Sequence, residues 1–181
     1  MRTYEQLKEN MVSKIKEYND IKPTGADGNY TSQEMGDKKT ILELLRRDTE
    51  ELMELIVFSL IKDRDNFFGN VIIQLHRKVD YSVSAAAAVA FKGTFFELQV
   101  NPLLFVPHTL REQKAILIHE MYHMICKHLP RTLPLFRLYP QTILNLGTDC
   151  AINQFITGLP DGCVTLQSLK NHWKVKRPLE E

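Results

Sequence analysis

The residues best suited to chemistry in this sequence are His119, Glu120 and His123, which form the motif HExxH. In a helix, residues four positions apart lie on the same face, so the two imidazoles can bind one metal ion. Glu120 lies beside them, within reach of a water molecule at that ion. The motif therefore predicts a zinc-binding helix. The alternative is a buried helix whose histidines only satisfy backbone groups. It is less favourable because burying these three side chains without partners costs several kcal/mol.

The residues on either side of the motif predict that it lies within a helix. Thr109 and Glu112 form a capping box, and apolar residues follow at helical spacing. Pro130 prevents the helix from continuing. The metal helix is therefore expected between Thr109 and Pro130.

A third ligand is needed, because catalytic zinc usually has three protein ligands and a water molecule. The candidates are His108, His128, Asp149, Cys150 and His172. His128 follows His119 by nine residues, which is about 180° around an unbroken helix. It would therefore point away from the metal unless the helix unwinds near Pro130.

Asp149 is the better-placed candidate. Residues 142–157 predict a second, largely apolar helix, in which Asn145, Asp149 and Asn153 form a polar stripe at spacings of four. A helix with so many apolar residues is expected to be buried, and the side chains of its polar stripe then need hydrogen-bond or metal partners. A metal ion with hydrogen bonds around it would supply them, and a solvated face is the alternative.

The remaining chain predicts one globular domain, since 181 residues with 44% hydrophobic content can form a sizeable core. Residues 4–18 predict a short, peripheral amphipathic helix, and residues 20–36 predict a polar loop. Residues 37–62 predict a long amphipathic helix. The apolar run at residues 71–75 is too short to decide between helix and strand.

Residues 79–100 predict β-structure. The segment Tyr81-Ser82-Val83 alternates, Val89–Phe91 and Thr94–Val100 are strand-like, and Lys92-Gly93 between them indicates a hairpin turn. Because Thr94–Val100 leads toward the metal helix, an exposed edge there could hold an extended peptide or protein substrate across the metal. An ordinary half-buried strand is equally compatible with this pattern.

The composition indicates which kinds of binding partner and which cellular compartment to expect. The formal net charge is +1, so nothing favours nucleic acid or an anionic membrane as a partner. No apolar run is long enough to span a bilayer. The three cysteines, Cys126, Cys150 and Cys163, lack the CxxC spacing, which favours reduced thiols and a cytoplasmic location.

The motif and its surroundings resemble a known family. The sequence continues as His119-Glu120-x-x-His123-x-x-x-x-His128-x-x-Arg131, with Val100-Asn101-Pro102 before it and Thr148-Asp149-Cys150-Ala151-Ile152-Asn153 after it. This combination resembles the metallopeptidase domain of bacteria and phages that is often linked to a von Willebrand A-like module, over about Leu75 to Pro160. The resemblance implies an α+β, zincin-like fold with a small sheet, an HExxH helix and a second helix that carries a ligand.

The resemblance also implies zinc bound by His119, His123 and Asp149, with Glu120 as the catalytic carboxylate. Glu120 is expected to accept a proton from the attacking water and to return it to the leaving amine. Candidates for hydrogen bonds around the metal or to the oxyanion are His128, Arg131, Tyr139 and Asn153. For Arg131 the alternative is a structural role at the end of the metal helix, where a basic group stabilises the dipole.

We therefore expect three parts: an N-terminal helix and polar loop at residues 1–36, the zincin-like domain at residues 37–165, and a basic tail at residues 166–181. The predicted function is that of a zinc metallopeptidase, a hydrolase of peptide bonds. The alternative is a catalytically silent zinc-binding domain that acts in assembly, with Cys150 or His128 filling the fourth coordination position.

Overall fold

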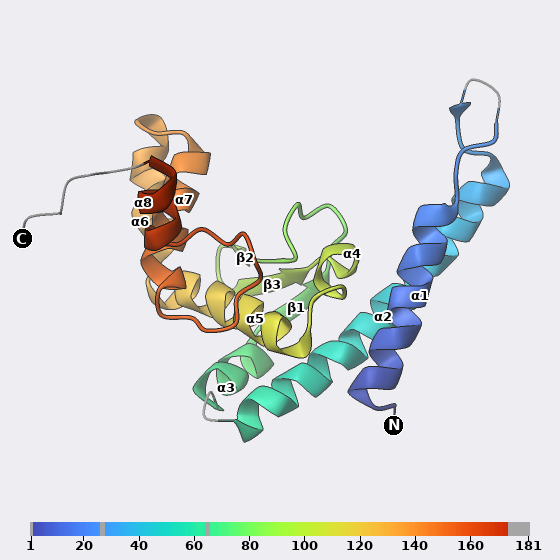
Figure 1. Ribbon diagram of the computed structural model, residues 1–181, viewed down its shortest axis with the longest axis horizontal. Coiled ribbons are helices and arrows are strands. Elements are labelled where there is room, and N and C mark those ends of the chain that lie inside the picture. The colour runs from blue at the N-terminus through green and yellow to red at the C-terminus, as the bar shows by residue number, and fades with distance from the viewer. Residues whose placement is uncertain (1, 26–27, 64–65, 174–181) are drawn as a thin grey trace, which may run out of the picture.

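The computed structural model describes residues 2–25, 28–63 and 66–173 and has the α+β class (Figure 1). In chain order the elements are α1 (Tyr4–Asp20), α2 (Ser32–Lys62), α3 (Asn66–Gln74), β1 (His76–Val79), β2 (Ala87–Phe91), β3 (Phe96–Val100), α4 (Pro102–Phe105), α5 (Leu110–Ile125), α6 (His128–Thr132), the 3₁₀ helix η2 (Leu133–Arg137), α7 (Gln141–Asn153) and α8 (Leu166–Trp173). Residues 174–181, the second half of the predicted basic tail, lie outside the described residues.

The first two helices form a hairpin at one end of the molecule (Figure 1). Each begins with a capping box, at Thr3 and at Thr31. The second cap starts α2 five residues before the predicted position, so α2 takes up the end of the expected polar loop. The prediction of a peripheral α1 was wrong, because its apolar side chains are buried in the main core: Leu7, Met11 and Ile15.

The sheet has three strands in the order β1-β3-β2, with β1 parallel and β2 antiparallel to β3. The predicted hairpin between β2 and β3 is confirmed, and Gly93 supplies the left-handed φ of 83° in its turn. Residues 81–83 form a turn region instead of the expected strand. The undecided run at residues 71–75 falls mainly in α3.

The position of β3 corrects the expected substrate strand. The segment Thr94–Val100 contains β3, which is paired on both sides, with β1 and with β2. Both of its edges are used by the sheet, so it cannot pair with a peptide. The strand next to the metal helix that keeps an outer edge is β2.

Helix α5 packs on the sheet and carries the HExxH motif (Figure 1). Thr109 and Glu112 form its predicted capping box. Its inner face places Leu117 and Met121 in the core with residues of α1, α2 and the sheet. The HExxH side chains then lie toward the other side of the helix, where β2 and α7 approach it.

The chain turns sharply after α5. Cys126 caps the helix, Lys127 takes a left-handed conformation with φ 53° and ψ 40°, and α6 starts at His128. After η2 the chain returns as α7, which ends at Asn153, four residues before the predicted end. In the part of the chain that the structure describes, no helix is long and apolar enough to cross a membrane.

Candidate metal centre

The side chains of His119, His123 and Asp149 converge from two helices. His119 and His123 come from α5 and Asp149 from α7. The two Nε2 atoms lie 2.9 Å apart, and Oδ1 of Asp149 lies 3.1 Å from His123 Nε2 and 3.7 Å from His119 Nε2. The structure thus brings together the three ligands that the resemblance implied.

The three atoms fit a zinc ion. Ligands of a tetrahedral zinc with bonds of about 2.0–2.1 Å lie about 3.3 Å from one another, and the three separations here bracket that value. Two imidazole nitrogens and one carboxylate oxygen are also a donor set that zinc takes at catalytic sites. The three side chains as the structure has them could therefore hold a metal ion.

Asn153 fixes the ring of His119. Its Oδ1 lies 2.7 Å from His119 Nδ1, and its amide nitrogen donates to the carbonyl of Val164 at 2.7 Å. Since the amide oxygen must then face the ring, His119 Nδ1 carries the proton and donates it. The lone pair of His119 is therefore on Nε2, the atom that faces His123 and Asp149.

His128 makes the matching contact with His123. The two Nδ1 atoms lie 2.9 Å apart, and His128 is buried. When His123 Nε2 binds a metal, its Nδ1 carries the proton and donates to His128. The neutral ring of His128 then carries its proton on Nε2. Since His128 lines the groove, this N–H is available there as a hydrogen-bond donor.

His128 reaches this position because α5 ends before it. An unbroken helix would point His128 away from His123, but the left-handed residue Lys127 turns the chain back toward His123. Burial, followed by the neighbouring His123, lowers the pKa of His128. The neutral ring is the form that can accept a hydrogen bond from His123.

Glu120 is held by the sheet. The backbone N–H of Val89 in β2 donates to Glu120 Oε2 at 2.8 Å, and Oε1 lies 4.0 Å from His119 Nε2. Burial raises the pKa of Glu120 to about 7. Burial also lowers the pKa of His119, with a further contribution from His123, so the neutral imidazole that a metal requires is favoured.

The other candidate residues do not belong to the ligand group. Arg131 donates to the carbonyl of Cys126 at 3.4 Å, near the end of α5, which agrees with its structural alternative. Tyr139 is 53% exposed and is absent from the residues that line the groove. His108 lines the groove but is not in the ligand group. His172 lies in α8, and its side chain lies outside the described part.

Cys150 does not join the ligands. It follows Asp149 in α7 but is buried, and burial raises the pKa of its thiol, which disfavours the thiolate that a metal would need. Among the described residues, the group that can share one ion consists of His119, His123 and Asp149. Neither of the two residues expected to fill a fourth position, Cys150 or His128, belongs to it.

A groove runs past these side chains. One part, of about 330 Å³, lies between β2, the end of α5 and the start of α7. A second part, of about 360 Å³, lies toward the loop after α7 and includes Leu159 and Val164. Both parts are lined by Ala85, Ala87 and the side chains of His119, Glu120 and Asp149. The candidate metal centre therefore lies in the middle of the groove.

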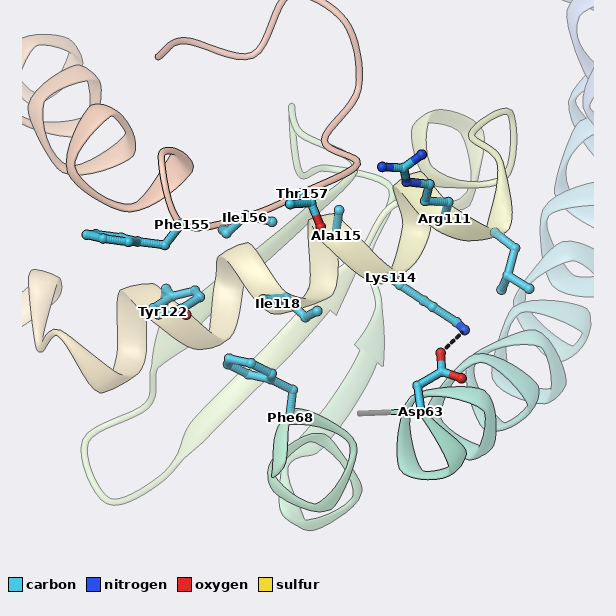
Figure 2. A pocket seen from close by; sticks show the side chains of 11 residues that line it. Asp63, Phe68, Arg111, Lys114, Ala115, Ile118, Tyr122, Phe155, Ile156 and Thr157 are labelled. Carbon is cyan, nitrogen blue, oxygen red and sulfur yellow. Dashed lines mark hydrogen bonds and ion pairs between the residues drawn. The ribbon is translucent and has the colours of Figure 1, made fainter. Parts of the chain in front are cut away.

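A larger pocket, of about 470 Å³, lies elsewhere on α5. It is lined by Phe68, Ile118, Tyr122 and Phe155, with Arg111 and Lys114 at its polar side (Figure 2). Its carboxylate, Asp63, pairs with Lys114 at 2.6 Å. None of the three ligands lines it, so this pocket is separate from the metal centre.

Two contacts of the centre were not predicted from the sequence. The N–H of Val89 and the carbonyl of Val164 are backbone groups, and a backbone donor or acceptor leaves no signature in residue type. The small side chains of Ala85, Ala87 and Ala88, which line the groove, were the available signal.

Comparison of the chain with models of known protein families, with curated proteins and with solved structures gives no match.

Proposed function

We propose that this protein is a zinc-dependent metallopeptidase with a zincin-like fold. One observation carries the proposal: two imidazoles of α5 and a carboxylate of α7 converge within a groove, with a second carboxylate beside them and a strand edge along one side. Zinc supplies Lewis-acid chemistry there, which acidifies water and polarises a carbonyl.

Glu120 is the general base of the proposed reaction. Val89 holds Oε2, which leaves Oε1 toward His119 and the groove. Oε1 takes a proton from the water that attacks the peptide carbonyl carbon. It then returns the proton to the nitrogen of the broken C–N bond, while the OH of the water stays on the carbon, so the products are a carboxylic acid and an amine.

The outer edge of β2 is the proposed binding edge for the substrate backbone. Because Val89 faces away from β3, the alternation of an antiparallel ladder also turns the N–H and C=O of Ala87 and Phe91 outward. An extended peptide can pair with these groups while its carbonyl lies at the metal centre. This replaces the expected pairing with the segment Thr94–Val100.

The reduced state of the cysteines is compatible with a cytoplasmic protein. Cys126, Cys150 and Cys163 are all free thiols in the structure. We therefore retain the cytoplasm as the proposed compartment.

The test separates metal binding from catalysis. Hydrolysis is measured on a pool of internally quenched fluorescent peptides, and zinc content is measured by mass spectrometry. Glu120→Gln should retain zinc and lower kcat/KM by about 10²–10⁴-fold, whereas His123→Ala should lose the metal. Glu112→Gln, a change in the capping box of the same helix, is the control.

A parent protein that binds zinc but cleaves no peptide would favour the silent zinc-binding domain. Full activity in Glu120→Gln would reject the proposed base.

A further inference from the structure

The chain next to the metal centre has an unusual charge composition. Residues 121–148 contain no aspartate or glutamate, although the whole chain has 22 acidic residues. The same segment contains the exposed cations Lys127, Arg131 and Arg137. It forms the end of α5, α6, η2 and most of α7, at the end of the molecule opposite the hairpin of α1 and α2 (Figure 1).

This cationic segment is also apolar at its surface. Leu133 is 61% exposed, Leu138 is 72% exposed and Ile143 is 54% exposed. Exposed apolar side chains that are gathered in one segment mark a binding surface more often than single ones do.

The segment contains a pocket of its own. A cavity of about 360 Å³ lies between α6, η2 and α7. Its apolar lining is Leu135, Ile143, Leu144, Gly147 and Ala151, and Arg131 lies at the same cavity. Such a cavity is suited to an aliphatic or aromatic side chain with an acidic neighbour.

The cavity borders the groove of the metal centre. It shares His128, Thr132 and Thr148 with the part of the groove that contains the ligands. That part of the groove is also lined by the uncharged polar side chains of Gln141 and Asn145, which suit a polypeptide backbone. A chain lying along β2 can therefore pass the ligands and enter this cavity.

We propose that this cavity, the distal cavity, binds a part of the substrate that lies several residues from the scissile bond and contains leucine or phenylalanine flanked by carboxylates. This inference rests on the proposed function and defines its substrate class as acidic, apolar polypeptides. The cations select the carboxylates by charge, and the cavity selects the apolar side chain by burial.

A peptide fits this surface better than a bilayer or a second copy of the chain. The distal cavity is concave and shares three lining residues with the groove of the metal centre, so a ligand that occupies both must be a narrow chain. A lipid surface can meet Leu133 and Leu138 but cannot follow the groove to His119.

The test measures binding without hydrolysis, in full-length Glu120→Gln protein loaded with zinc. The probe is a fluorescein-labelled peptide with four central alanines, flanked on both sides by leucine and phenylalanine alternating with glutamate. Two matched peptides replace glutamate by lysine, or leucine and phenylalanine by serine. Fluorescence anisotropy should give a Kd at least about tenfold lower for the acidic, apolar probe than for either matched peptide.

Gly147→Phe should remove most of this preference. A Cβ at Gly147 meets no atom within 4 Å, so the new ring can enter the distal cavity without disturbing α7. Gly36→Phe is the matched control, because Gly36 is also a helical glycine with open space around it, in α2. The second variant, Arg131→Glu with Arg137→Glu, should invert the preference between the glutamate and lysine probes.

Equal Kd values for the three peptides, or equal effects of Gly147→Phe and Gly36→Phe, would overturn the inference. Two further results would also overturn the inference. One is sedimentation of the protein with phosphatidylserine vesicles that Gly147→Phe abolishes, and the other is a dimer in analytical ultracentrifugation that Gly147→Phe abolishes. Selective binding without hydrolysis by the parent protein would reject the peptidase and keep the distal cavity. Hydrolysis by the parent protein, with no effect of Gly147→Phe on peptide binding, would reject the distal cavity and keep the peptidase.

Discussion

The ligands of the candidate centre depend on residues that do not touch the metal. Asn153 holds the proton of His119 on Nδ1, and His128 accepts from His123. Such contacts orient an imidazole before the ion arrives, and losing one typically lowers metal affinity by about 10–100-fold. The positions of these two side chains therefore matter as much as the motif itself.

Asn153→Ala should weaken zinc binding by about 10–100-fold, because the His119 ring loses the acceptor that fixes its tautomer. Competition with a chromogenic zinc chelator gives the affinity. Asn145→Ala is the control, since Asn145 belongs to the same polar stripe two turns earlier, whereas the hydrogen bond to His119 comes from Asn153. Equal affinities for the two variants would show that Asn153 does not position His119.

The residues of the candidate centre could be chosen from the sequence, but the position of His128 relative to the others could not be predicted. The spacing of His119, His123 and the stripe through Asp149 follows from helical geometry alone. His128 could not be placed in the same way, because its position depends on the left-handed turn at Lys127, a residue type that gives no signal for that conformation.

At the scale of elements, β2 and β3 could be predicted, but β1 and the order of the strands could not. Residues of β1 are mostly charged or polar, so the segment His76–Val79 lacks the alternation of a half-buried strand. Its pairing with β3 puts that strand in the centre and leaves β2 beside α5. A local pattern does not contain this long-range pairing.

The outer edge of β2 can be tested with proline, which removes a backbone N–H. Val89→Pro should lower kcat/KM by at least about tenfold, since Glu120 loses the donor that orients it. The ladder to β3 stays intact because this N–H points outward. Val89→Ala, which shortens the same side chain but keeps this N–H, is the control, with thermal unfolding to check both folds. Similar activities in the two variants would contradict the role of Val89.

The pairing of α1 with α2 depends on a buried carboxylate. Asp48 accepts a hydrogen bond from Lys14 of α1 and forms an ion pair with Arg2. Burial by itself raises the pKa of Asp48, but the bonds from Lys14 and Arg2 outweigh it and leave the pKa below its usual value. The folded state therefore binds this proton less readily than the unfolded state.

Stability from Asp48 should be fully present above the unfolded pKa of about 3.9 and should disappear as the pH falls through the lower folded pKa. Asp48→Asn should cost about 3 kcal/mol at pH 7, because it leaves Lys14 without its charged partner. Urea unfolding at pH 7 and pH 3 measures both effects. In the exposed control Glu43→Gln the free energy of unfolding should hardly change. A loss for Asp48→Asn that was as large at pH 3 as at pH 7 would contradict this linkage.

Across the whole molecule, the core and the groove are unequally packed. The residues of the main hydrophobic core come mostly from α1, α2, α3, the sheet, α4 and α5. In α7, only Cys150, Ile152 and Asn153 are buried. The helix that supplies Asp149 is thus held more loosely than the helix that supplies the histidines, so the ion should act as a link between them.

Removal of zinc should therefore loosen one end of the molecule and leave the other unchanged. With zinc bound as proposed, Asp149 would tie α7 to α5, and binding would stabilise only the folded arrangement of both helices. Hydrogen exchange is measured before and after treatment with EDTA. After treatment it should be faster in α7 and unchanged in α2, whose apolar side chains are part of the main core. The Asp149→Asn variant should already show the faster exchange before treatment. If α2 and α7 responded equally, or if neither responded, the ion could not be the link between α5 and α7 that the three converging side chains require.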